Sequence, residues 1–243
     1  MQKHRFIYDL MCQSDMYNVG IASAEVYGAS VRDCEAIHVP HRNGDVLNDN
    51  ECYHNRKVAY HCWIARTFLE DFKKLRDELM GRNDGKYHYL SDTFDVGHTH
   101  LARLESISEP ETKIQRRVGE FDIVFDCKPQ RYRSDSLTWK TVTAGTFNNP
   151  TYHKAYPLLK ITGKGTVTIE KQIITVLPEC PFSTVWVDCE TMDAYANGDN
   201  ENDLKNCNKY VTLPLDNVVL NRGGNNISLS GCTLEMCPNW YDL

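Results

Sequence analysis

The sequence predicts an α+β fold that is mostly β, with one long helix in its first half and a β-sandwich or jelly roll in its second half. Three observations predict it. A single long amphipathic helical pattern occurs before residue 82. Short β-prone segments separated by Gly, Pro and Asn follow residue 133, and no helical pattern occurs among them. The boundary between the two kinds of pattern falls near residues 133–137. We therefore expect two domains, residues 1–133 and 134–243.

The helix is predicted over residues 67–81. Four apolar residues recur at i, i+4, i+7 and i+11 and so share one face: Phe68, Phe72, Leu75 and Leu79. Thr67 and Glu70 have the spacing of a capping box, which places the start of the helix at Thr67. Gly81 predicts its end.

Short runs of β-prone residues predict the strands. In the first domain they are residues 58–63, 87–90 and 120–126. In the second domain they are residues 137–143, 157–162, 165–170, 172–177, 184–189, 210–213, 217–220, 226–229 and 233–237. Gly163-Lys164-Gly165 is expected to be a tight connection, and the polar residues 197–208 a surface loop.

Composition narrows the function classes. The 243 residues are 25% charged and 41% hydrophobic, as in an ordinary globular protein. A net charge of −6 is unusual for a binder of nucleic acid. No apolar run approaches the ~18 residues that span a bilayer, and the N-terminus lacks the apolar core of a signal peptide. We expect no membrane insertion, and synthesis and assembly in a cytoplasm.

Ten cysteines raise the alternatives of disulfides, zinc or free thiols. No two of them stand in a Cys-x-x-Cys pair, which structural zinc sites usually need. Thiols in a cytoplasm stay reduced. We expect free, mostly buried cysteines that act as small apolar residues.

Other chemical motifs are weak. His98 and His100 alternate on one strand as a metal half-site would, and His38 and His41 flank a short turn, but no carboxylate or cysteine has the spacing to complete either set. The glycine-rich residues 222–226 precede no helix that could bind phosphate. There is no G-x-S-x-G motif. The chain has so many carboxylates that the sequence can neither locate nor exclude a catalytic acid pair of the glycosidase type. We predict no enzyme activity, no catalytic residue, no metal and no cofactor.

Residues 121–133, FDIVFDCKPQRYR, allow three interpretations. Cys127 could be a nucleophile activated by nearby cations, the basic residues could bind nucleic acid, or the stretch is a buried strand and its exit. The third is favoured, because Cys127 has no identified base and Pro129 cannot continue a central strand. We expect three basic residues to make inter-domain or inter-subunit contacts: Lys128, Arg131 and Arg133.

Aromatic residues of the second domain have two interpretations. Exposed rings on one sheet face could stack on sugars, whereas buried rings would fill the core between two sheets. Core filling is favoured for the set as a whole. The candidates for sugar stacking are Trp139, Tyr152, Trp186 and Tyr195, with Trp240 considered beside them.

Five segments in register resemble the distal tail proteins of long-tailed bacteriophages or prophages. They are residues 37–45 (IHVPHRNGD), 66–95, 119–132 (ending CKPQRY), 147–169 (with NPT and ITGKG) and 185–195 (VWVDCETMDAY). CKPQRY is the strongest match. His41 departs from the pattern, since the family commonly has Gly there, so this turn must allow a non-glycine residue. Residues 219–227 match only loosely.

This resemblance implies a structural protein of the virion tail tip. Members form a hexameric ring through their N-terminal domains, continue the tail tube and let DNA pass through the lumen without specific binding. Their galectin-like C-terminal sandwiches serve as platforms for other parts. The implied partners are the tail tube protein, the tape-measure protein, the tail-associated tip protein and receptor-binding proteins. A carbohydrate-binding module for attachment to the host surface is the alternative function, and an acidic lumen that repels DNA follows as a hypothesis from the net charge.

Overall fold

The computed structural model describes residues 4–112, 118–197 and 203–243. The chain divides into two compact units, residues 1–131 with residue 243, and residues 132–242. Strands dominate both units, and the described residues contain one α-helix. The predicted mostly-β, α+β fold class is confirmed.

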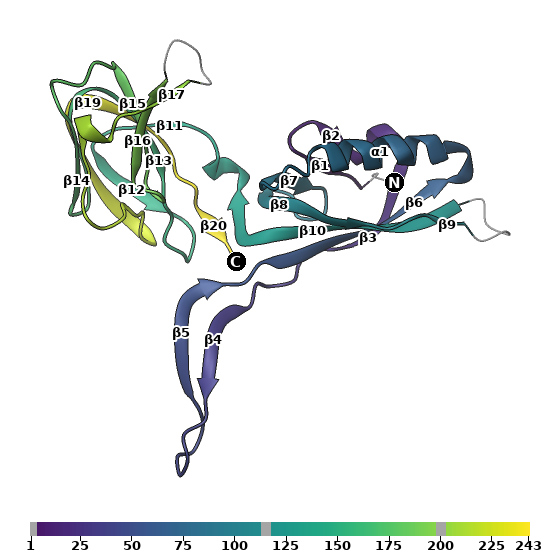
Figure 1. Ribbon diagram of the computed structural model, residues 1–243. Coiled ribbons are helices and arrows are strands. Elements are labelled where there is room, and N and C mark those ends of the chain that lie inside the picture. The colour runs from purple at the N-terminus through teal and green to yellow at the C-terminus, as the bar shows by residue number, and fades with distance from the viewer. Residues whose placement is uncertain (1–3, 113–117, 198–202) are drawn as a thin grey trace. The chain divides into compact units, whose positions relative to one another are not determined.

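The first unit is a sheet covered on one face by the helix (Figure 1). The strand order is β2-β1-β7-β8-β10-β6-β3, and β9 pairs with β10. Its elements are β1 (Phe6–Tyr8), β2 (Cys12–Gln13), η1 (Ser14–Tyr17), β3 (Val19–Glu25), β4 (Arg32–Ile37), β5 (Val46–Tyr53), β6 (Arg56–Ala65), η2 (Arg66–Phe68), α1 (Leu69–Gly81), β7 (His88–Asp92), β8 (His98–Ile107), β9 (Glu111–Thr112) and β10 (Val118–Arg133).

The predicted helix begins later than its capping pattern suggested. A turn of 3-10 helix, η2, precedes α1, and the N-cap is Phe68, which makes no side-chain capping bond. The expected cap at Thr67 is therefore wrong. Phe68 consequently leaves the apolar face and is 42% exposed, whereas Phe72, Leu75 and Leu79 are buried and α1 ends at Gly81 as predicted. None of the described helices is long and apolar enough to cross a membrane.

Alternating apolar residues of the strands build the core beneath α1. Phe6 stacks on Tyr60 with ring centres 5.0 Å apart, and Phe72 of the helix meets Phe121 edge to face at 4.9 Å. The strand β10 runs through Pro129, which was expected to end it. Its paired register with β6 ends earlier, at Cys127, so the missing N–H of Pro129 costs no bond with β6.

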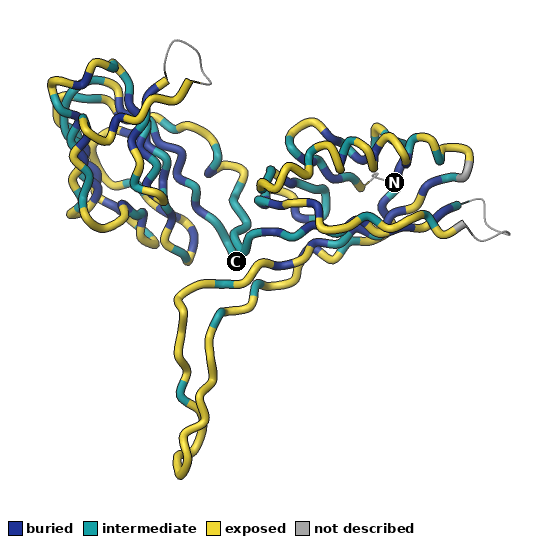
Figure 2. The backbone as a smooth tube through the Cα atoms, in the orientation of Figure 1, coloured by how far each residue is buried: buried dark blue, intermediate teal, exposed yellow. Residues whose placement is uncertain are grey.

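Strands β4 and β5 form a separate two-stranded hairpin between β3 and β6 (Figure 1). All residues from 32 to 53 are described, and none of them is buried (Figure 2). His41 holds a left-handed φ of 66°. Its turn therefore keeps the conformation that glycine favours, which histidine adopts more readily than most other residues.

The second unit is an antiparallel β-sandwich. Six strands follow the order β11-β19-β13-β15-β16-β17, while β12 pairs with β19, and β14 with β13 and β18. Its elements are η3 (Ser134–Ser136), β11 (Lys140–Val142), β12 (Gly145–Asn149), β13 (Leu158–Ile169), β14 (Gln172–Val176), β15 (Thr184–Asp188), β16 (Asp193–Asn197), β17 (Leu204–Asn206), η4 (Asn208–Tyr210), β18 (Val211–Thr212), β19 (Gly223–Cys237) and β20 (Tyr241–Asp242).

Two predicted connections in this unit are interior parts of strands. The residues Gly163-Lys164-Gly165 form an irregularity within β13, where the pairing with β19 shifts register. Glycine is required at Gly165, because a Cβ there would lie 2.0 Å from the carbonyl oxygen of Ser230. The second connection is residues 230–232, because the predicted strands 226–229 and 233–237 join through it as the single strand β19. Residues 217–220 were predicted as a strand and contribute only an isolated bridge, at Leu220. The predicted loop 197–208 contains β17, and its residues 198–202 lie outside the described ranges.

Candidate assembly and binding surfaces

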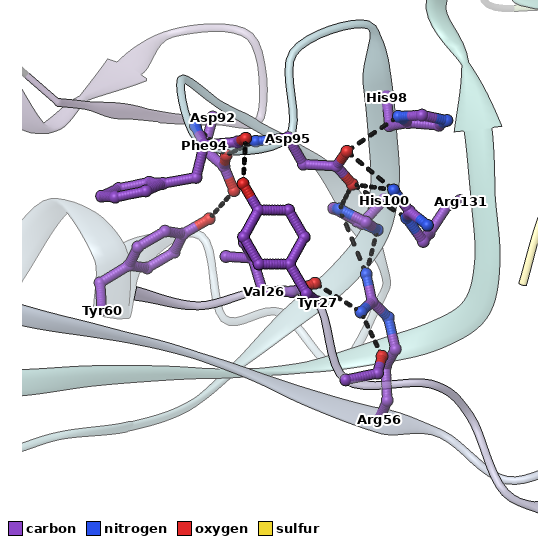
Figure 3. A network of polar contacts seen from close by, with 11 residues as sticks. Val26, Tyr27, Arg56, Tyr60, Asp92, Phe94, Asp95, His98, His100 and Arg131 are labelled. Carbon is purple, nitrogen blue, oxygen red and sulfur yellow. Dashed lines mark hydrogen bonds and ion pairs between the residues drawn. The ribbon is translucent and has the colours of Figure 1, made fainter. Parts of the chain in front are cut away.

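A polar network around Asp95 lies in the turn between β7 and β8 (Figure 3). Its turn is shaped by Asp92, whose Oδ1 accepts bonds of 2.7 Å from the backbone N–H groups of Phe94 and Asp95. The buried carboxylate of Asp95 then accepts two bonds from the guanidinium of Arg131, at 2.9 and 2.8 Å. Such a bidentate pair fixes both side chains more firmly than a single contact would.

The other side of the network is a buried arginine. Arg56, 6% exposed, donates to the carbonyl oxygens of Val26 and Gly28, both at 2.7 Å, and to Nδ1 of His100 at 3.1 Å. The Nε2 atom of His100 lies 3.7 Å from Asp95. A neutral imidazole that accepts at Nδ1 and carries its proton on Nε2 fits both neighbours.

We expect His100 to stay neutral throughout the physiological range. Burial, and then the charge of Arg56, lower its pKa to about 3. Because this folded pKa lies below the unfolded value, the unfolded chain binds the proton first. The stabilisation is therefore complete above about pH 6.5 and is lost as pH falls toward the folded pKa. NMR of the imidazole should show no titration of His100 between about pH 5 and 8, and His100→Gln should reduce the acid dependence of unfolding. A normal titration curve would contradict this assignment.

Cys127 lies in the core of the first unit. It is fully buried, and burial raises the pKa of its thiol to about 12, with only partial compensation from Arg56. A thiolate is the nucleophilic form of cysteine. The structure therefore favours the structural interpretation of Cys127. All ten cysteines are free, as expected.

Alkylation should separate the buried thiol from exposed ones. Cys34 and Cys52 lie exposed on the hairpin. We expect iodoacetamide to modify Cys34 at pH 8 in the native protein and to leave Cys127 unmodified until denaturant is added. Peptide mass spectrometry measures both sites in one sample. Equal modification of Cys127 and Cys34 would show that the core opens more readily than its packing implies.

The three basic residues at the end of β10 have separate partners. Lys128 places its ammonium 5.4 Å from the centre of the Tyr87 ring. Arg131 belongs to the network described above, and the Nε atom of Arg133 lies 3.8 Å from a carboxylate oxygen of Asp135. The predicted role of the three residues in inter-domain or inter-subunit contacts stays a prediction.

The outer face of the first sheet carries a cavity of about 770 Å³ beside His61. Asp122 lies 2.7 Å from Nδ1 of His61 and raises the pKa of the imidazole. Cys62 also borders the cavity, but neighbouring residues of a strand point to opposite faces, and the side chain of Cys62 lies in the core while that of His61 faces outward. Cys62 is 3% exposed, and burial raises the pKa of its thiol to about 12. The structure therefore does not pair an ionised thiol with His61.

The hairpin exposes apolar as well as charged side chains. Leu47 is 66% exposed, Ile37 43% and Val39 37%. An ion pair between Arg32 and Asp49 crosses its strands. A two-stranded hairpin without a core is marginally stable at best in water. This segment is therefore a candidate assembly surface.

Two of the four candidate sugar-stacking residues come together in the second unit. Trp186 of β15 and Tyr195 of β16 are cross-strand partners with nearly parallel rings, 6.3 Å apart. They lie on the face opposite the core, because Val185 and Val187 on either side of Trp186 are buried.

The other aromatic candidates are placed elsewhere. Trp139 is 43% exposed, and Tyr152 is 72% exposed beneath the guanidinium of Arg222. Trp240 is buried against Phe147 in the core, as the core-filling interpretation expected for the set. Strand alternation places Trp186 of β15 on the outer face, whereas Trp240 lies in the segment between β19 and β20, where no alternation could have predicted its burial.

Metal ligands are not gathered in the described parts of the chain. Within residues 4–112, 118–197 and 203–243, no group of three or more His, Cys, Asp or Glu side chains could hold a metal ion. His98 and His100 both approach Asp95, with Nδ1 of His98 at 2.9 Å. Arg131 donates to the same carboxylate, and Arg56 donates to His100.

Comparisons with known proteins identify the fold. No family model matches the chain, and no curated protein matches its sequence. Among solved structures, the hub adsorption protein Dit of phage SPP1 is similar over 97% of this chain and 98% of its own, with a TM-score of 0.72 and 11% identity. Two structures of the activated phage p2 baseplate, with calcium and with strontium, have TM-scores of 0.53 and 0.52 at 10% identity and cover 97% and 96% of this chain. The fold expected from the resemblance to distal tail proteins is confirmed.

Proposed function

We propose that this chain is a structural component of a phage tail tip, a distal tail hub that joins the tail tube to the tip or baseplate and the host-adhesion apparatus. The observation that carries the proposal is the likeness to the SPP1 hub protein across almost the full length of both chains. On this proposal the protein belongs to the virion tail and is assembled in the cytoplasm of a bacterial host. The proposal treats residues 1–133 as the ring-forming domain and 134–243 as the platform.

A ring of six copies follows from the same proposal. Its partners would be the tail tube, tape-measure and tail-associated tip proteins, together with receptor-binding proteins. The exposed hairpin supports such assembly, because a strand pair with no core of its own gains stability against a neighbour. With a net charge of −6 per chain, six copies make an electronegative assembly through which DNA passes without specific binding.

The proposed hub is not an enzyme and uses no cofactor. The neighbours in structure are hub and baseplate proteins. The two thiols that were considered as nucleophiles, Cys127 and Cys62, are buried with raised pKa values. Both observations support a role in assembly in preference to catalysis.

Mass measurement of the purified protein tests the proposal. We expect light scattering or native mass spectrometry to find a species of six times the 28.0 kDa chain, and negative-stain images to show six-fold rings. Addition of the tail tube protein should favour the ring if it closes slowly alone. A protein that stays monomeric at high concentration, with and without that partner, would overturn the ring.

A second candidate function is saccharide binding at the outer face of the second unit. The observation that favours it is the stacked pair Trp186 and Tyr195, beside the ion pair of Lys160 with Glu235 on neighbouring strands. Flat aromatic surface next to hydrogen-bonding groups suits a sugar ring.

Substitution of one ring tests this candidate. We expect Trp186→Ala to lower binding on a glycan array roughly tenfold or more, the scale of one aromatic contact. Trp139→Ala is the matched control, because it removes an exposed tryptophan that lies outside the pair. A blank array for the unmodified protein, or equal binding by the two variants, would remove the saccharide function and leave the hub proposal intact.

A further inference from the structure

The connection between β1 and β2 holds two residues in a strained conformation. Asp9 and Leu10 have φ angles of 52° and 60°, and the N–H of Met11 bonds to the carbonyl oxygen of Tyr8 at 3.4 Å. Hairpin turns with two positive φ values strongly prefer Asn-Gly or Asp-Gly. A leucine in the second position is costly, and such strain gathers at functional places.

The strained turn presents apolar side chains to water. Leu10 is 74% exposed and Met11 is 69% exposed. We call these two residues the Leu10–Met11 knob. Neither side chain contributes to the core of its own unit, so their apolar character at this position is unexplained by folding.

A groove of matching character lies on the same unit. Its volume is about 450 Å³, within the range of specific binding pockets. Apolar side chains from the first half of α1, from the end of β8 and from the segment after β8 form much of it. We call it the α1 groove, and its lining is Leu69, Phe72, Lys73, Arg76, Ile107, Ser108, Glu109 and Pro110.

The knob and the groove lie at opposite ends of α1. Arg82, the residue after the helix, forms an ion pair with Asp9 at the base of the knob. Phe72 in the groove precedes Arg82 by ten residues, or roughly 15 Å of helix. Figure 1 shows β1 and β2 at one end of the helix and β9 beyond the other.

The charges around the two surfaces are paired within the unit itself. In the turn segment, residues 9–16, Asp9 pairs with Arg82 and Asp15 with Arg5. Beside the groove, Lys73 pairs with Glu70 and Arg76 with Asp77. The match between the two surfaces therefore rests on their apolar side chains.

We propose that the Leu10–Met11 knob of one subunit inserts into the α1 groove of a second copy of this chain. Because knob and groove are different surfaces, the contact is head-to-tail and repeats from copy to copy until a ring closes. This inference rests on the proposed ring and names one contact that the ring needs, beside the contacts proposed for the hairpin.

Replacement of Leu10 separates assembly from folding. Leu10→Gly removes the side chain and relieves the left-handed strain, so we expect unchanged or higher thermal stability together with weaker association. Leu10→Asp should weaken association roughly 10- to 100-fold, as expected when a large aliphatic side chain leaves an interface. Val96→Asp is the matched control, since Val96 is an equally exposed apolar residue of another turn in the unit.

A mixing experiment tests the pairing of the two surfaces. Leu69→Glu places a carboxylate in the groove at the first turn of α1, where a negative charge suits the helix dipole. The Leu10→Asp and Leu69→Glu variants should each fail to form rings. An equal mixture retains one intact knob and one intact groove per pair, and should form dimers of twice the 28.0 kDa chain and nothing larger. Native mass spectrometry resolves these species.

The outcomes distinguish this contact from the ring itself. Rings formed by Leu10→Asp as readily as by the unmodified chain would overturn the knob contact while the hub proposal stands. Monomeric variants whose mixture yields no dimer would overturn the pairing of knob with groove. A monomeric unmodified chain would overturn the ring, and this inference with it.

Discussion

Asp95→Ala should destabilise the first unit by about 3–5 kcal/mol, the cost of leaving a buried charge without its partner. The substitution removes the carboxylate that accepts both bonds from Arg131 and faces His100. The guanidinium of Arg56 remains buried nearby. Two cationic groups then share a site with no anion between them.

The unfolding of the first unit can be followed at one residue. Trp63 is the only tryptophan in residues 1–131, and the other three lie beyond them. Fluorine NMR of protein labelled with 5-fluorotryptophan therefore gives this unit its own resonance during denaturant titration. Asp49→Ala is the control, because it breaks a bidentate pair with Arg32 on the exposed hairpin. Equal midpoints for the two variants would show that the Asp95 network adds no stability.

Removal of the hairpin should abolish the ring and leave the first unit folded. The N–H of His54 bonds to the carbonyl oxygen of Val31 at 2.9 Å, so these residues already have the hydrogen bond of a two-residue turn. Replacing residues 32–53 with Asn-Gly suits such a turn. Since none of these described residues is buried, the free energy of unfolding should change by less than about 1 kcal/mol.

Two measurements check this variant. Light scattering should find a monomer where the unmodified chain forms a hexamer, and the Trp63 resonance should keep its unfolding midpoint. The single substitution Leu47→Asp provides a milder version, because it alters one exposed apolar residue and retains the hairpin. A shortened chain that still closes into rings would assign assembly to other surfaces.

Regular local patterns made much of the fold predictable. The helical spacing of Phe72, Leu75 and Leu79 identified the buried face of α1, because burial on a helix repeats every 3.6 residues. The start of α1 was misplaced because Thr67, which has the spacing of a capping box, lies inside the 3-10 turn that precedes the helix. The irregularity at Gly165 was predicted as a connection, since glycine marks both turns and close backbone approaches.

Features that depend on distant residues were beyond the sequence patterns. The network of Arg56, Asp95 and Arg131 joins segments far apart in the chain. Only Arg131 was singled out from the sequence, and its partner Asp95 was not. The strands of the hairpin were missed for a different reason. Exposure of both faces removes the alternation of apolar and polar residues by which a strand is recognised. The resemblance marked residues 37–45 as a turn segment, which is where its tip lies.

The hairpin also presents a hazard before assembly. Each of its two strands pairs on one side, so the outer edge of each offers N–H and C=O groups to any passing strand, including that of an identical chain. Alternating charges on β4, such as Asp33 and Glu35, act as gatekeepers that oppose indiscriminate pairing with another acidic hairpin. A subunit that waits for its neighbours must stay soluble in the meantime. The acidity of this hairpin therefore guards the free chain against aggregation.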